Sequence, residues 1–228
     1  MRTETISIPA EGGSFAGYLA WPDHPNGMVM VILHEIFGVN EPVQALTRRY
    51  AQDGYLAIAP DMLWRLEPGL ALGYSREETL RALSIVKDFD LAQGVEDLGC
   101  VLDALRSRGA DGRIGVLGLC MGGTLAFLAA ARLSVDAAIS FYGTALEDHL
   151  DEIPKMRCPV QLHYGGRDRF IPTEIVGRIA GALTAHRPAD VHVYAEGDHG
   201  FYTRGRPEDI ALAHQRAADF LRTAFAED

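Results

Sequence analysis

Short apolar runs that alternate with helix-like segments constrain the fold of this 228-residue chain more than any other feature. The runs at 28–35 (MVMVILHE) and 54–61 (GYLAIAPD) are largely apolar, which is typical of parallel strands covered on both faces. Between them, Asn40 as an N-cap, Pro42 in the first turn and Gly54 beyond the end predict a helix. The first part of the chain therefore predicts a βαβ unit.

The same alternation continues to the end of the chain. Ser75 followed by Glu78 forms a capping-box pattern that predicts a second helix, and Asp90 begins a third. Further strands are expected at 113–119, 137–143, 159–166 and 191–197, and further helices after Cys120, over about 173–185 and from about Pro207. Residues 5–22 alternate around Gly12-Gly13, which predicts an antiparallel hairpin. The predicted class is α/β: a mainly parallel central sheet with an N-terminal antiparallel hairpin and helices on both faces.

Length and composition favour one domain over residues 1–228, because a single core can still grow to this size. The N-terminus lacks the apolar segment of a signal peptide, and no run approaches the ~18 apolar residues of a membrane span. A net charge of -10 disfavours nucleic acid and anionic membranes as partners. We therefore expect a cytoplasmic protein that acts on a small molecule, either as a monomer or as a homodimer.

The three cysteines, Cys100, Cys120 and Cys158, are odd in number and fit no C-x-x-C spacing. Neither a disulfide framework nor a zinc site is therefore indicated, and reduced thiols are expected.

Cys120 lies in the sequence GLCMGG, after an apolar strand and before a helix. This fits the strand–turn–helix pattern G-x-S-x-G, with sulfur replacing oxygen. The glycines let strand and helix approach closely around a strained turn, and the helix N-terminus favours a thiolate. The pattern predicts that Cys120 is a nucleophile, with the N–H groups of Met121 and Ile36 as oxyanion-hole donors.

A nucleophile needs a base and an acid that orients the base. His199 follows the last predicted strand and Asp168 follows the strand before it, so the order nucleophile, acid, histidine is that of α/β-hydrolases. Asp198 is the alternative acid, but an immediate neighbour rarely reaches Nδ1 of its own histidine. His34 and His163 are expected in the core, and the remaining histidines are expected at the surface: His24, His149, His186, His192 and His214.

At this point the chain resembles the dienelactone hydrolase family of α/β-hydrolases. The resemblance runs over nearly the whole chain and is carried by HEIFGVN (34–40), APD (59–61), GLCMGG (118–123), YGGRD (164–168) and DHGF (198–201). It implies a triad of Cys120, His199 and Asp168, with Glu35 taking the thiol proton when substrate arrives. It also implies hydrolysis of an unsaturated, carboxylate-bearing lactone, dienelactone, to maleylacetate. We expect no metal and no organic cofactor.

The resemblance further implies that arginines hold the substrate carboxylate, and Arg204 with Arg81 or Arg76 are the candidates. Glu35 has a second interpretation, as a solvated or salt-bridged acid at a strand end. A carboxylate over the pocket after a buried strand is costly without a partner, so for the functional role we expect an arginine as its counter-ion. Residues 144–158 are too few for an independent lid domain, so the segment 63–69 is expected to form part of the specificity wall. Trp64 is its candidate contact, unless it and Leu66 only pack locally.

The sequence leaves one alternative function open and disfavours two others. A broad-specificity carboxylesterase or thioesterase would use the same residues. A class I glutamine amidotransferase also has a G-x-C-x-G elbow but requires other residues where this chain has Gly123-Thr124 and Phe201. A non-catalytic binding protein of the same fold would be expected to lack the nucleophile or the base.

Overall fold

The computed structural model describes residues 1–186 and 190–226. The chain divides into two compact units, residues 1–114 and 115–228, and each is described by itself. The single domain expected over residues 1–228 remains a prediction.

The sheet of the first unit is mixed. Strands β1 (Arg2–Ala10) and β2 (Gly13–Trp21) form the predicted antiparallel hairpin, with Gly12 in the left-handed region at φ +84° in the turn. Strand β2 continues antiparallel to β4 (Leu56–Pro60), which in turn lies parallel to β3 (Val29–Leu33). Every residue of β3 is buried, as its apolar run predicts.

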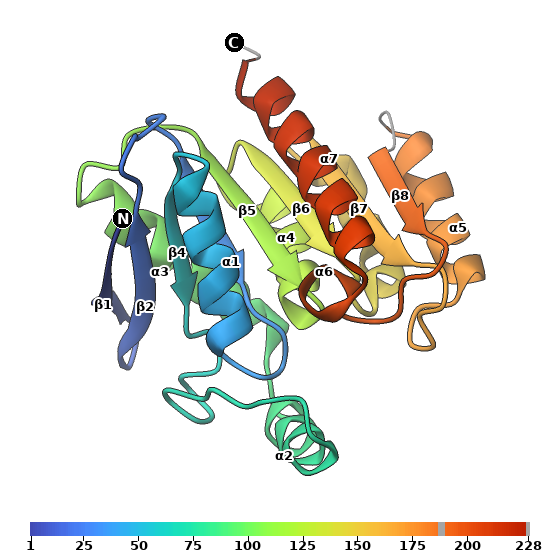
Figure 1. Cartoon of the computed structure of the whole chain (residues 1–228), viewed down its shortest axis with the longest axis horizontal. Coiled ribbons are helices and arrows are strands. Elements are labelled where there is room, and N and C mark those ends of the chain that lie inside the picture. The colour runs from blue at the N-terminus through green and yellow to red at the C-terminus, as the bar shows by residue number, and fades with distance from the viewer. Residues whose placement is uncertain (187–189, 227–228) are drawn as a thin grey trace. The chain divides into compact units, whose positions relative to one another are not determined.

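The helices of the first unit begin at the predicted caps. The side chain of Asn40 accepts from the Val43 amide at the start of α1 (Glu41–Gln52), and Ser75 and Glu78 form the capping box of α2 (Arg76–Val86). Asp90 caps α3 (Leu91–Arg106). Figure 1 shows α1 in front of this unit's strands and α3 behind them, so helices cover both faces.

The second unit contains all of β5 (Ile114–Leu119) after its first residue, together with β6 (Ala137–Phe141), β7 (Val160–Gly165) and β8 (Asp190–Tyr194). Each of these strands is parallel to its neighbour. Helix α7 (Pro207–Ala226) covers the near face in Figure 1, whereas α4 (Met121–Arg132) lies behind. Helix α5 (Thr173–Thr184) begins where the sequence predicts. Because the strands are parallel, the loops after β5, β7 and β8 leave the same edge of the sheet.

Two short elements were not expected from the sequence. The 3₁₀ helix η1 (Leu146–Lys155) is kinked at His149, and the single turn α6 (Phe201–Arg204) directly follows the His199 loop. The segment after β6 is therefore a short helical connection and carries no separate lid domain. The elements confirm the α/β-hydrolase fold, with a mainly parallel sheet and an N-terminal antiparallel hairpin. None of the helices within residues 1–186 and 190–226 combines the length and the apolar character that a membrane-spanning helix needs.

Candidate active site

Cys120 sits at a sharp turn between β5 and α4, with φ 54° and ψ -118°. A positive φ is unusual for a residue with a side chain and stores strain, as the elbow pattern predicts. The nearby glycines make the turn possible. A Cβ atom on Gly118 would lie 1.8 Å from the Gly122 carbonyl oxygen, and one on Gly123 would lie 2.7 Å from Oγ of Ser140. The turn therefore excludes any larger residue at these two positions.

The main chain fixes the direction in which the turn faces. The Cys120 amide donates to the Phe141 carbonyl at 3.0 Å, and its own carbonyl accepts from Gly123 at 2.8 Å. Cys120 is partly exposed, whereas Met121 begins α4. The Met121 N–H thus belongs to the first turn of a helix, whose donors have no carbonyl within the helix to bond.

Asp168 and His199 come together from the loops after β7 and β8. Oδ2 of Asp168 lies 2.7 Å from Nδ1 of His199, while Oδ1 accepts the amides of Phe170 at 2.8 Å and Ile171 at 3.3 Å. The Asp168 side chain has no exposed surface. Its carboxylate is therefore held by the turn that follows β7 and can orient the imidazole.

The His199 ring is flanked by two aromatic rings that the sequence did not single out. The ring centroids of Tyr142 and Phe170 each lie 5.0 Å from that of His199, and Phe170 is 69% exposed. Tyr142 has φ 40° directly after β6. Its place after a parallel strand is the signal that could have found it.

His199 also hydrogen bonds with Cys120, so it joins the nucleophile candidate to Asp168. Burial alone would lower its pKa, but the hydrogen bonds and charges of Asp168 and Cys120 raise the pKa of His199 to about 10. The ring therefore carries its proton at neutral pH. The three predicted residues form one hydrogen-bonded series in the order Cys120, His199, Asp168.

Glu35 and Ile36 follow β3 in the first unit. Glu35 is only 2% exposed, in contrast to the solvated acid of the alternative interpretation. The preceding His34 is completely buried and both its ring nitrogens are bonded, which confirms its predicted place in the core.

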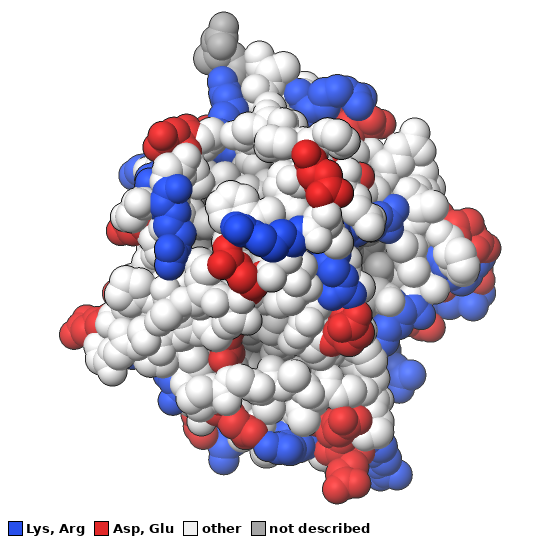
Figure 2. Space-filling view, turned by 60° about the vertical axis from the view of Figure 1, so that its left-hand side comes forward, with Lys and Arg blue, Asp and Glu red and all other residues white. Residues whose placement is uncertain are grey.

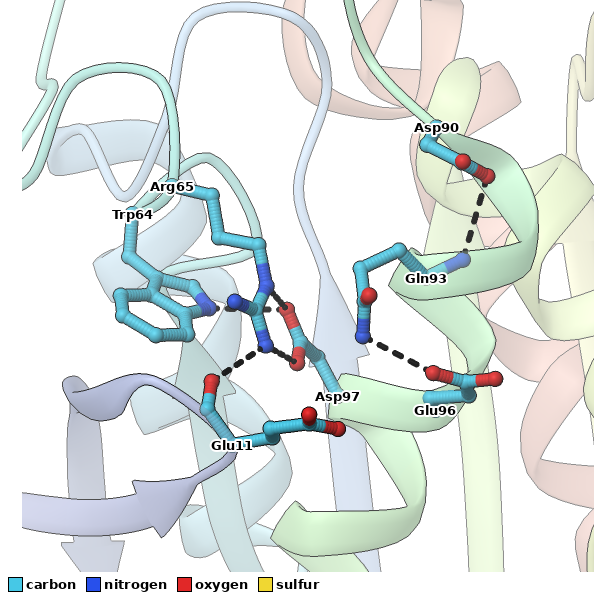
Figure 3. Close-up of polar contacts among 7 residues, drawn as sticks. All are labelled: Glu11, Trp64, Arg65, Asp90, Gln93, Glu96 and Asp97. Atoms are coloured by element: carbon cyan, nitrogen blue, oxygen red, sulfur yellow. Dashed lines mark hydrogen bonds and ion pairs between the residues drawn. The ribbon is translucent and has the colours of Figure 1, made fainter.

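Trp64 lies in a cluster that surrounds the buried carboxylate of Asp97 (Figure 3). Asp97 accepts from the Trp64 indole at 2.8 Å and from two nitrogens of Arg65 at 2.9 and 2.8 Å. Arg65 also donates to the Glu11 carbonyl, and the Trp64 ring stacks on Phe15 at 5.4 Å. Trp64 thus has a packing role, and its contact with the substrate stays a prediction. Sequence reasoning did not identify Asp97.

The candidate arginines lie in different settings. Arg81 of α2 is exposed and pairs with Glu67, and Arg76 begins the same helix. Arg204 ends α6, where a Cβ on Gly200 would lie 2.0 Å from its guanidinium. Arg204 and His199 line one cavity of about 340 Å³. Of the three arginines, Arg204 therefore shares a cavity with a predicted catalytic residue.

The other histidines partly follow the prediction. His163 is buried between Tyr194 at 2.9 Å and Gln161 at 2.7 Å, and burial lowers its pKa. His24 and His186 are exposed as predicted, whereas the surface prediction is wrong for His149, His192 and His214, which are half-buried. His192 pairs with Asp190 and His214 bonds with Tyr202, at 2.9 Å each.

Acidic and basic side chains are interspersed on the face that Figure 2 shows, so the net charge of -10 does not gather there into one acidic surface. Within the described residues, no disulfide joins Cys100, Cys120 or Cys158. In the part of the chain that the structure describes, no group of three His, Cys, Asp or Glu residues is arranged to hold a metal ion.

The parallel strands and the elbow after β5 define a hydrolase of the α/β-hydrolase class. The profile of the dienelactone hydrolase family matches residues 15–225. Carboxymethylenebutenolidase from Pseudomonas putida is 35% identical over 228 residues, which cover 97% of each chain. Carboxymethylenebutenolidase 1 from Cupriavidus pinatubonensis is 31% identical and covers 91% of this chain and 89% of its own.

A crystal structure from Klebsiella pneumoniae, provisionally assigned as a dienelactone hydrolase, superposes with a TM-score of 0.84 at 30% identity and covers 100% of this chain and 99% of its own. The chain therefore belongs to the dienelactone hydrolase family and is a dienelactone hydrolase-like lactone hydrolase.

Proposed function

We propose that this cytoplasmic enzyme hydrolyses a small, carboxylate-bearing unsaturated lactone, carboxymethylenebutenolide, to maleylacetate through an acyl-enzyme on Cys120. The observation that carries the proposal is the hydrogen-bonded series of Cys120, His199 and Asp168 at the elbow after β5. The carboxymethylenebutenolidase name of the relatives supports this substrate.

In the proposed reaction, the Cys120 thiolate attacks the lactone carbonyl carbon and forms a tetrahedral oxyanion. The N–H groups of Met121 and Ile36 donate to that oxygen. When the oxyanion collapses, the ring C–O bond breaks, the enolate oxygen leaves and the product tautomerises to a ketone. His199, which is protonated at neutral pH, supplies the proton that the leaving oxygen takes.

Water then attacks the thioester carbonyl, and neutral His199 accepts the proton that the water loses. Cys120 departs as a thiolate, the carboxylic acid is released and the imidazolium–thiolate pair is restored. Glu35 takes the thiol proton when Cys120 starts the cycle protonated. The net change is one lactone plus one water to one open-chain keto acid.

Arg204 and Arg81 are the proposed contacts for the substrate carboxylate, and Trp64 is the proposed contact from the segment 63–69. A guanidinium can donate two parallel hydrogen bonds to a carboxylate, which suits it to this role. The cavity that Arg204 shares with His199 supports Arg204 most directly.

The test compares the hydrolysis of cis- and trans-dienelactone with that of p-nitrophenyl acetate, an ester without a carboxylate. We expect a preference for the lactones that falls in Arg204→Ala or Arg81→Ala through a higher KM. Iodoacetamide should alkylate Cys120 and stop both reactions. Equal turnover of lactone and neutral ester, unchanged in both variants, indicates a broad-specificity carboxylesterase instead. Full turnover after alkylation of Cys120 excludes the proposed nucleophile.

A further inference from the structure

His34 is a buried, titratable residue that the proposed reaction does not use. Its Nε2 atom accepts the Met62 amide at 3.0 Å, and its Nδ1 atom lies 2.6 Å from the Glu35 carbonyl oxygen. Because an amide N–H can only donate, Nε2 carries no proton and Nδ1–H donates to the carbonyl. Burial lowers the pKa of His34, which keeps the ring in this neutral form.

The carbonyl that His34 holds belongs to the same peptide group as the N–H of Ile36. A trans peptide is planar and its C=O and N–H point in opposite directions. The Glu35 carbonyl also accepts the Gly38 amide at 3.3 Å. Two donors therefore fix the carbonyl, and the direction of the Ile36 N–H is fixed with it.

The other partner of His34 belongs to a segment that is itself held firmly. The buried carboxylate of Asp61 accepts the amides of Leu63 at 3.2 Å and Gly69 at 2.7 Å. This segment then returns to the chain after Glu35, because the Leu72 amide donates to the Phe37 carbonyl at 2.9 Å. His34 thus links the Glu35–Ile36 peptide to the segment that the Asp61 carboxylate holds.

We propose that His34 is a positioning residue for the oxyanion hole: its Nδ1–H orients the Glu35–Ile36 peptide so that the Ile36 N–H is held ready to donate. The inference rests on the proposed function, in which Ile36 supplies the second donor. It assigns a role in the reaction to a histidine that does not itself contact the substrate.

Two variants separate this role from support of the fold. His34→Leu fills the site but can neither donate nor accept, whereas His34→Gln carries both a donor and an acceptor on its amide. Thr47→Val is the matched control, since it removes one buried hydrogen bond in α1, from Thr47 to the Val43 carbonyl at 2.8 Å, away from the peptide.

Each protein is treated with two reagents. p-Nitrophenyl acetate acylates Cys120 through a tetrahedral oxyanion. Methyl methanethiosulfonate instead transfers its methylthio group, as the sulfur of Cys120 attacks and methanesulfinate leaves, without any oxyanion. The release of nitrophenolate measures the rate of acylation. Mass spectrometry of the Cys120 peptide measures the rate of disulfide formation.

We expect His34→Leu to slow acylation by about 10- to 100-fold, less than or comparable to the loss of an oxyanion donor, with KM and the rate of disulfide formation near wild type. His34→Gln should recover most of the acylation rate, and Thr47→Val should match wild type. Equal acylation by His34→Leu and wild type, or parallel loss of both reactions, would overturn the role of His34.

A measurement on the wild-type enzyme keeps the inference testable if His34→Leu does not fold. Nitrogen NMR of the imidazole at pH 7 should show a neutral ring protonated at Nδ1, and a proton at Nε2 or a doubly protonated ring would contradict the assignment. A separate control tests the proposed function itself. Wild-type enzyme is first converted to the methyl disulfide at Cys120 and is then given the ester; full ester cleavage would show that Cys120 is not the nucleophile.

Discussion

Asp168 contacts His199 with one carboxylate oxygen and the main chain of its own turn with the other. Oδ2 lies 2.7 Å from Nδ1 of His199, and Oδ1 accepts the amides of Phe170 and Ile171. The position of the acid is therefore set by local backbone, independently of the histidine. Asp198, although adjacent to His199 in sequence, is exposed.

This relationship predicts that replacing Asp168 lowers kcat strongly, whereas replacing Asp198 changes kcat little. Asp168→Asn replaces the acceptor with an amide that can no longer favour the protonated, correctly oriented imidazole, so kcat for ester hydrolysis should fall by about 10³- to 10⁴-fold. Asp198→Asn is the matched control and should stay within about threefold of wild type. Steady-state kinetics on p-nitrophenyl acetate measure both, and the reverse ranking would make Asp198 the acid.

The pKa of His199, about 10, predicts how the ring titrates. Because that value lies above the ordinary 6.5, stability from this group is complete below about pH 6.5 and is lost as pH rises toward 10. NMR titration of the wild-type ring should give a midpoint near 10. In Cys120→Ala the midpoint should fall, since one partner of the charged ring is gone. An unchanged midpoint would show that Cys120 does not contribute.

The glycines of the elbow predict a contrast in stability with those of α5. Gly118→Ala would place a Cβ 1.8 Å from a backbone oxygen and should destabilise the fold by more than about 4 kcal/mol or prevent folding. Gly177→Ala has nothing within 4 Å of its Cβ and should stabilise by about 0.5 to 1 kcal/mol. Urea unfolding measures both changes. A tolerated alanine at position 118 would mean that the elbow is looser than described.

Two salt bridges of the first unit should differ in their contribution to stability. Arg65→Ala leaves the Asp97 carboxylate, whose side chain is 3% exposed, with the Trp64 indole as its one remaining donor among the described residues, while Arg65 itself is 31% exposed. We expect a loss of about 2 to 3 kcal/mol, below the range for a fully buried pair. Arg81→Ala removes an exposed pair with Glu67 and should cost less than about 1 kcal/mol. Equal losses in urea unfolding would contradict this account.

Features with a local chemical cause were predictable from the sequence. The caps at Asn40, Ser75 and Asp90 lie where expected, because each satisfies amides within three residues. The glycine pattern around Cys120 likewise has a local cause, since the close approach of strand and helix is encoded within six residues.

Features that depend on long-range packing were not predictable. Asp97 lies on α3 between the buried residues Val95 and Leu98, and its pairing with Arg65, 32 positions earlier, explains a buried charge there. The polar partner of His214 also comes from another element, because Tyr202 of α6 lies 2.9 Å from this residue of α7. The single turn α6 is too short to leave a periodic pattern in the sequence.

The main-chain angles at Cys120 also limit which nucleophilic residues can replace it in related proteins. At φ 54° and ψ -118°, a replacement residue must have an unbranched Cβ, and serine meets this condition because it differs from cysteine only in its terminal atom. Threonine, which adds a branch at that carbon, does not. The bend thus permits an interchange between a thiol and a primary alcohol and bars the secondary alcohol, whatever reaction the surrounding pocket selects.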